Sequence, residues 1–205
     1  RRVALVHNGI IENYRQLREE LTAQGYVFES ETDTEAAVQL ITSYLDQGLD
    51  PREATQQALQ RLEGAFALGI VFAGHDDLLI AARRGSPLVI GWGEGAMYLG
   101  SDAMALAPFT DRVTYLRDGD WAVLSRNGAE VRDENGHQIA PQVKQTALTG
   151  AQVGKGGFRH FMLKEIYEQP SVIGETLNTY FNPLTRTVLL PKVPFDLATV
   201  PKITI

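Results

Sequence analysis

The chain has 205 residues, 44% of them hydrophobic and 21% charged, so it can bury the core of a globular protein. Its formal net charge of -6 argues against a nucleic-acid partner, because binding phosphate requires a basic face. It contains no cysteine, which excludes disulfides, zinc–thiolate sites and a catalytic thiol within these residues. No apolar run approaches the roughly 20 residues of a membrane helix, and no signal-peptide pattern opens the chain, so we expect a cytoplasmic protein without membrane contact.

The first sixty or so residues favour one strand followed by three helices. Val3–Val6 is a short apolar run that predicts a buried strand, and the turn residues His7-Asn8-Gly9 are expected to end it. Each predicted helix then starts with a capping residue and a partner three positions on. These pairs are Asn13 with Gln16, Thr32 with Glu35, and Asp50 with Glu53.

From Ala65 to Arg132 the apolar period shortens and turn residues recur, which predicts a series of strands. Asn127-Gly128 suits a two-residue type I′ hairpin turn. Helices followed by a run of strands favour an α+β fold over alternating βαβ units. The expected strands are Phe66–Phe72, Leu78–Ala82, Leu88–Ile90, Met97–Leu99, Val113–Leu116 and Trp121–Leu124.

The C-terminal quarter differs in character. Gln138–Gly157 is polar and glycine-rich and is interpreted as a linker, followed by a helix over Phe158–Asn178 that Pro170 should interrupt. Ile203–Ile205 could begin another strand. We therefore expect one domain over residues 1–157 and a second segment over residues 158–205.

Several motifs in order resemble the class II glutamine amidotransferases, in particular the glucosamine-6-phosphate synthase branch. The sequence HNGIIEN at 7–13 is similar to the oxyanion-hole motif of that branch. Together the motifs cover nearly the whole chain, which makes the resemblance specific. The others are Ser30–Glu35, Arg84–Leu88, Gly100–Asp102 and Lys164–Pro170, the last of which resembles the segment that joins the glutaminase part to the sugar-isomerase part.

The resemblance implies an N-terminal-nucleophile hydrolase fold, a four-layer α-β-β-α sandwich, here incomplete at its N-terminus. A cysteine thiolate would attack the side-chain amide of glutamine, and the ammonia would convert fructose-6-phosphate to glucosamine-6-phosphate. No cofactor is implied, and a homodimer is expected. Because the nucleophile and the upstream Arg-Trp clamp for the glutamine carboxylate are not in these residues, we expect the chain alone to be inactive.

The resemblance also assigns site residues. Asn8 and Gly9 would form the oxyanion hole, through the Asn side-chain amide and the Gly backbone N–H. Asp33 would pair with the α-ammonium of glutamine, and Gly9 would also contact the substrate. Each has a simpler reading: Asn-Gly is common in turns, and Asp33 would stabilise a helix N-terminus.

Other residues carry weaker signals. His7 lies beside Asn8 but is interpreted as structural, and the remaining histidines are too scattered to predict a metal site. Two alternative functions stay open: a non-catalytic regulatory or binding module with this fold, and a different N-terminal-nucleophile enzyme.

Overall fold

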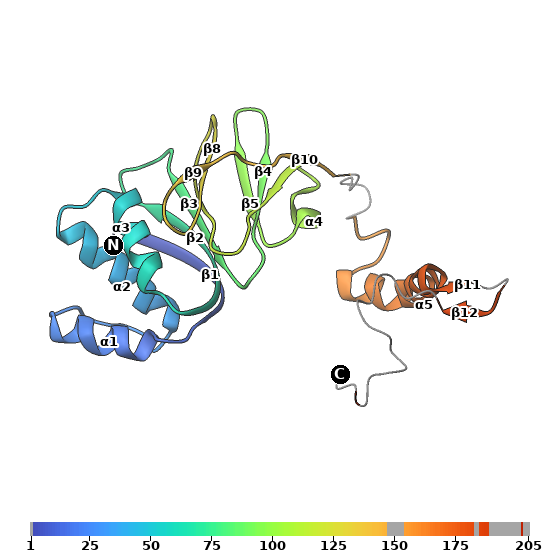
Figure 1. Cartoon of the computed structure of the whole chain (residues 1–205), viewed down its shortest axis with the longest axis horizontal. Coiled ribbons are helices and arrows are strands. Elements are labelled where there is room, and N and C mark those ends of the chain that lie inside the picture. The colour runs from blue at the N-terminus through green and yellow to red at the C-terminus, as the bar shows by residue number, and fades with distance from the viewer. Residues whose placement is uncertain (1, 147–153, 183–184, 189–201, 203–205) are drawn as a thin grey trace. The chain divides into compact units, whose positions relative to one another are not determined.

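The computed structural model describes residues 2–146, 154–182, 185–188 and 202 (Figure 1). It divides into two compact units, Arg1–Val153 and Gly154–Ile205. The expected boundary after residue 157 falls close to this division, while the assignment of these units to functional domains stays a prediction.

Three helices follow the first strand, as predicted: α1 (Tyr14–Ala23), α2 (Asp33–Asp46) and α3 (Pro51–Arg61). The Thr32 hydroxyl caps α2, and the Asp50 side chain begins α3 with both halves of a capping box. The predicted side-chain cap of α1 is wrong. Asn13 instead donates to the Arg61 carbonyl at 2.8 Å and accepts the Glu63 N–H at 3.1 Å, so it joins α1 to the chain after α3.

The first sheet has six antiparallel strands in the order β1-β2-β3-β7-β8-β9. β1 lies at one edge of this sheet and pairs with β2 along its whole length. The strands are β1 (Val3–Ile11), β2 (Gly64–Phe72), β3 (Leu79–Arg84), β7 (Trp121–Ser125), β8 (Gly128–Arg132) and β9 (Gln138–Ile139).

The second sheet has four antiparallel strands in the order β10-β6-β4-β5. Its members are β4 (Val89–Trp92), β5 (Met97–Gly100), β6 (Arg112–Tyr115) and β10 (Lys144–Gln145), and the short helix α4 (Ala103–Leu106) follows β5.

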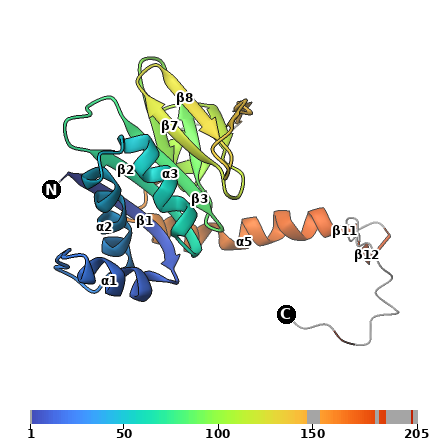
Figure 2. The ribbon, with the colours of Figure 1, turned by 60° about the vertical axis from the view of Figure 1, so that its left-hand side comes forward.

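Three apolar cores hold the four layers of this unit together. The first lies between α1–α3 and the first sheet and contains Leu17, Leu40 and Phe66. The second lies between the two sheets, where Ala81 and Ile90 are fully buried. The third packs α4 against the outer face of the second sheet, and Figure 2 shows the helices α1–α3 on the opposite side of the first sheet. The expected α-β-β-α layering of an α+β fold is therefore confirmed.

Two predictions about the strands are corrected. The first strand does not end at His7 but continues to Ile11, because residues 8–11 pair in register with Ala67 to Gly64 of β2. The β7–β8 hairpin exists, but Ser125 pairs with Gly128, so the two loop residues are Arg126 and Asn127. Asn127 does not have positive φ, so the turn is not type I′.

The predicted linker over Gln138–Gly157 is also wrong in its first part. β9 adds to the first sheet through Val131 and Arg132, and β10 adds to the second through Arg112 and Val113. Residues 147–153, in the middle of that predicted linker, lie outside the described residues.

The second unit contains α5 (Phe161–Tyr180), β11 (Phe181–Asn182) and β12 (Thr187–Val188). The helix continues through Pro170, so this proline does not interrupt it as predicted. No helix in the described part of the chain is long and apolar enough to cross a membrane. The predicted strand at Ile203–Ile205 lies outside the described residues.

Candidate functional site

The backbone of β1 presents alternate residues to its free edge. The Arg2 carbonyl accepts the Ala73 N–H at 2.9 Å, and the Glu12 N–H donates to the Glu63 carbonyl at 2.9 Å, with unbroken register between these two pairs. Since hydrogen-bonded pairs alternate in an antiparallel ladder, the even-numbered residues of β1 bond to β2. The N–H groups of odd-numbered residues, Gly9 and Ile11 among them, therefore point to the other edge, where no described strand pairs with them.

The side chain of Asp33, the first residue of α2, lies at this edge of β1. Its Oδ2 accepts the Ile11 N–H at 2.9 Å, and its Oδ1 accepts the Thr34 N–H at 2.8 Å. The predicted position of Asp33 at a helix N-terminus is confirmed. Gly9 is two residues from Ile11, about 7 Å along an extended strand, so its N–H points to the edge that Asp33 occupies.

Asn8 lies on the face of β1 turned away from the helices. It is exposed, and its side-chain amide makes no hydrogen bond to another of the described residues. Its neighbours on this face are Val6, which is 72% exposed, and Ile10, which is 64% exposed. An amide with two free N–H donors between apolar side chains can donate to an oxygen that approaches this face.

Gly9 can only be glycine in this backbone. Its φ is +119°, and a Cβ there would lie 2.1 Å from the Ala65 carbonyl oxygen across the sheet. Gly85, from the Arg84–Leu88 motif, has φ +71°, and a Cβ there would lie 2.6 Å from the Ala65 Cβ. Two of the motifs thus meet on one small residue of β2, Ala65.

Glu35 fixes the loop before Asp33. Its carboxylate accepts the N–H groups of Glu29 and Ser30, both at 2.7 Å, and the Ser30 hydroxyl at 2.6 Å. Burial opposes ionisation of this carboxyl, but the hydrogen bonds from Ser30 and from the Glu29 backbone outweigh it and hold the pKa of Glu35 below its ordinary value. The negative charge of Glu35 is therefore part of what holds the Ser30–Glu35 motif in place.

Glu35→Gln is expected to lower the free energy of unfolding by about 1 kcal/mol at pH 7, because a neutral amide accepts these bonds more weakly. A carboxyl whose pKa is lower in the folded state stabilises the fold above its unfolded pKa and loses that contribution as pH falls through the folded value. Urea unfolding at pH 7 and at pH 3 should therefore show the difference at pH 7 and little of it at pH 3. The exposed neighbour Glu31, changed to Gln, is the control; an equal loss in both variants at pH 7 would contradict this role of Glu35.

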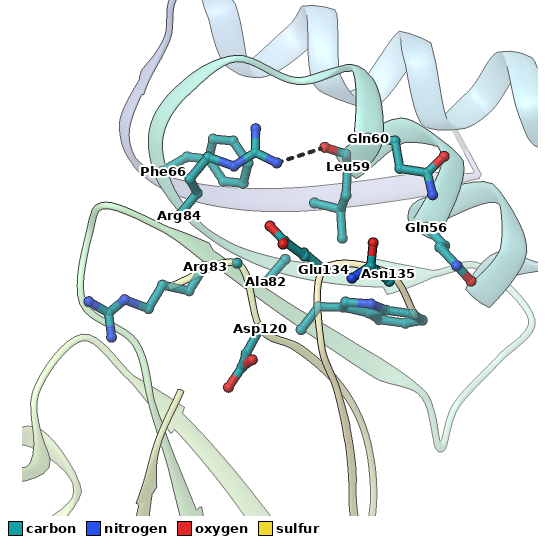
Figure 3. Close-up of a pocket in the computed structure, with 12 residues that line it drawn as sticks. Gln56, Leu59, Gln60, Phe66, Ala82, Arg83, Arg84, Asp120, Glu134 and Asn135 are labelled. Atoms are coloured by element: carbon teal, nitrogen blue, oxygen red, sulfur yellow. Dashed lines mark hydrogen bonds between the residues drawn. The ribbon is translucent and has the colours of Figure 1, made fainter. Parts of the chain in front are cut away.

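Two cavities of this unit are lined in part by α3 and by α2, respectively. One of about 330 Å³ is lined by α3, β3 and the loop before β9, with Gln56, Arg84 and Glu134 on its walls (Figure 3). A groove of about 830 Å³ lies between the first residues of β1 and α2 and includes Thr34. Neither is lined by Asn8, Gly9 or Asp33.

The structure thus places Gly9 and Asp33 at one edge of β1 and Asn8 on the adjoining face. Two contributors to this arrangement were missed from the sequence: the Ile11 N–H, because the strand was predicted to end earlier, and Thr34. The signal for Thr34 is its position next to Asp33 in the Ser30–Glu35 motif. Among the described residues no group of three His, Asp or Glu side chains could hold a metal ion.

Comparisons with known proteins agree on one family. The family described as "Glutamine amidotransferase domain" matches residues 1–108. The chain is 54% identical over 205 residues to the glutamine–fructose-6-phosphate aminotransferase (isomerizing) of Bradyrhizobium diazoefficiens, and 49% identical over 204 residues to that of Gluconobacter oxydans. It is covered completely in both cases but spans only 34% of the length of each relative.

Solved structures show the same likeness. The glutamine phosphoribosylpyrophosphate amidotransferase of B. subtilis, complexed with ADP and GMP, superposes with a TM-score of 0.56 at 25% identity. That match covers 66% of this chain and 30% of the other. The structure described as the allosteric regulatory enzyme of purine biosynthesis matches with a TM-score of 0.52 at 27% identity, over 64% of this chain and 28% of the other. The N-terminal-nucleophile hydrolase fold expected from the motifs is thereby confirmed.

Proposed function

The chain belongs to the glutamine amidotransferase family, and on that premise we propose that it forms the glutamine-hydrolysing part of a glutamine–fructose-6-phosphate aminotransferase. The observation that carries the proposal is the edge of β1, where the outward Gly9 N–H and the Asp33 carboxylate share one side of the strand. The 54% identity to a relative of that name, over the whole chain, supports fructose-6-phosphate as the proposed acceptor.

The proposed roles follow from the chemistry of each group. Nucleophilic attack on the side-chain amide of glutamine places negative charge on its oxygen, which the Asn8 side-chain amide and the Gly9 N–H would stabilise. Protonation of the amide nitrogen then lets ammonia leave, and water releases glutamate from the acyl intermediate. The Asp33 carboxylate would bind the α-ammonium, which three carbon atoms separate from the reacting carbonyl carbon.

Other parts of the proposal concern the whole protein and have the family resemblance as their support. We place the enzyme in the cytoplasm as a homodimer. Its proposed partners are glutamine and a sugar phosphate, and the net charge of -6 disfavours binding an extended polyanion such as a nucleic acid. No cysteine is among these 205 residues, so a thiol nucleophile would be supplied by another part of the protein.

These 205 residues alone are expected to release no ammonia from glutamine above background, because they contain no thiol. The measurement is ammonia release by the purified 205-residue chain, with its circular dichroism as the check that it is folded. Turnover by the folded chain would contradict the proposed thiol mechanism.

The function itself is tested with the protein that contains this chain, glutamine labelled with ¹⁵N at the side-chain amide, and fructose-6-phosphate. The expected products are glutamate and ¹⁵N-labelled glucosamine-6-phosphate, identified by mass spectrometry. Glutamate without a labelled amino sugar would identify another amidotransferase. Glutamine binding without hydrolysis would favour the non-catalytic binding module instead.

A further inference from the structure

His7 is buried on the helix-facing side of β1, beneath the start of α2. Its side chain is only 4% exposed, and its Nδ1 lies 3.0 Å from the Thr34 hydroxyl oxygen and 3.8 Å from the Asp33 Oδ1. Its Nε2 is buried and has no hydrogen-bond partner among the described residues. A buried polar atom without a partner is costly, and an apolar side chain of similar size would avoid that cost. The stabilising contact of this imidazole is therefore the one at Nδ1.

The Thr34 hydroxyl lies between His7 and Asp33. Its oxygen is 3.0 Å from His7 Nδ1 and 3.4 Å from Asp33 Oδ1. A hydroxyl has one proton to donate, so it can donate to Asp33 only if His7 donates to it. The tautomer with the proton on Nδ1 satisfies both contacts and leaves Nε2 as a bare lone pair rather than a buried N–H. The negative charge of Asp33, close to Nδ1, favours the same tautomer.

These contacts hold both oxygens of the Asp33 carboxylate. Oδ2 is bound by the Ile11 N–H of β1 at 2.9 Å. Oδ1 is bound by the Thr34 N–H at 2.8 Å and faces the Thr34 hydroxyl, which His7 orients. Because the side chain of Asp33 is still 23% exposed, a cation at the β1 edge can reach a carboxylate whose plane is already fixed.

We propose that His7 and Thr34 are positioning residues, which orient the Asp33 carboxylate for the α-ammonium of glutamine through the chain Nδ1–H to hydroxyl to carboxylate. This rests on the proposed function, since it assigns the ligand of Asp33. In this role both residues act through Asp33 and not by direct contact with the substrate. A carboxylate held in place before binding loses less side-chain freedom when the ligand arrives, so the pair should act on substrate affinity more than on the chemical step.

The test is Thr34→Val in the protein that contains this chain, with glutamine hydrolysis followed at varied glutamine concentration. The side chains have nearly the same shape, but valine cannot relay the bond. KM for glutamine should rise about fivefold to tenfold, while kcat stays within about twofold. Thr34→Ser keeps the hydroxyl and should restore KM. If Thr34 served packing alone, Thr34→Ser would raise KM and Thr34→Val would not. Valine keeps the methyl group of threonine, whereas serine lacks it.

Thr42→Val is the matched control, because the Thr42 hydroxyl lies on the same helix and donates only to the Val38 carbonyl at 2.7 Å. It should leave KM unchanged. His7→Leu should raise KM as Thr34→Val does, without lowering the melting temperature, and the double variant should be no worse than either single one.

An unchanged KM in Thr34→Val, a loss confined to kcat, or equal effects of valine and serine would overturn the positioning role while leaving glutamine hydrolysis intact. Failure of the unmodified protein to hydrolyse glutamine would instead overturn the proposed function, and this inference with it.

Discussion

Asn8→Ala is expected to lower kcat for glutamine hydrolysis by about 10²–10³, with a much smaller change in KM. The Asn8 amide meets the amide oxygen most strongly once that oxygen carries negative charge, so its loss affects the transition state more than the bound ground state. Asn8 is exposed and its side chain makes no hydrogen bond to another described residue, so Asn8→Ala should leave the fold intact. The loss of kcat would therefore not result from misfolding.

The measurement is initial-rate kinetics of ammonia release, with melting temperature recorded for each variant. Asn127→Ala, in the loop of the β7–β8 hairpin, is the matched control and should leave both constants unchanged. If Asn8→Ala instead raised KM and spared kcat, the side chain would bind the ground state and would not belong to an oxyanion hole.

Asp33→Asn is expected to raise KM for glutamine at least about 30-fold, the effect of roughly 2 kcal/mol, with a smaller change in kcat. The amide oxygen of asparagine can still accept the Ile11 N–H that Asp33 binds at 2.9 Å, so the fold is retained while the charge is removed. An ammonium pair exists before and during the reaction, which is why affinity should fall first.

Asp50→Asn is the control, because Asp50 also lies at the start of a helix. It distinguishes loss of a substrate contact from loss of a negative charge near a helix N-terminus. It should change stability slightly and KM not at all. Equal kinetic effects of the two substitutions would show that Asp33 acts through the helix and not on the substrate.

Local signals predicted the starts of α2 and α3 correctly. The start of α3 follows from Asp50, Pro51 and Glu53 alone, because a capping box depends only on residues within one turn. Asn13 was mispredicted for the opposite reason: its partners, the Arg61 carbonyl and the Glu63 N–H, are far along the chain. The length of β1 likewise depends on its partner strand. β1 continues through His7-Asn8-Gly9 because these residues pair with β2, and Gly9 and Gly64 take positive φ where the two strands approach closely.

For the candidate site, motif resemblance supplied Asn8, Gly9 and Asp33, and the structure supplied the relation between them. Nothing in the sequence places the His7 ring beside Thr34, because the two are 27 positions apart and meet only when α2 lies over β1. The buried Nε2 of His7 is equally invisible without the fold.

Along β1, N–H groups bonded to β2 alternate with N–H groups that point to the free edge. In amide hydrogen exchange, the bonded N–H groups can therefore serve as a reference for those at the edge. The N–H groups of Ala4, Val6 and Asn8 are held in the ladder with β2, so they should exchange slowly with solvent deuterium. The Gly9 N–H, on the free edge, should exchange quickly until an anionic or carbonyl oxygen binds there. A ligand at this site would thus slow one amide of the strand while its neighbours stay unchanged, and occupancy could be followed residue by residue without any catalysis.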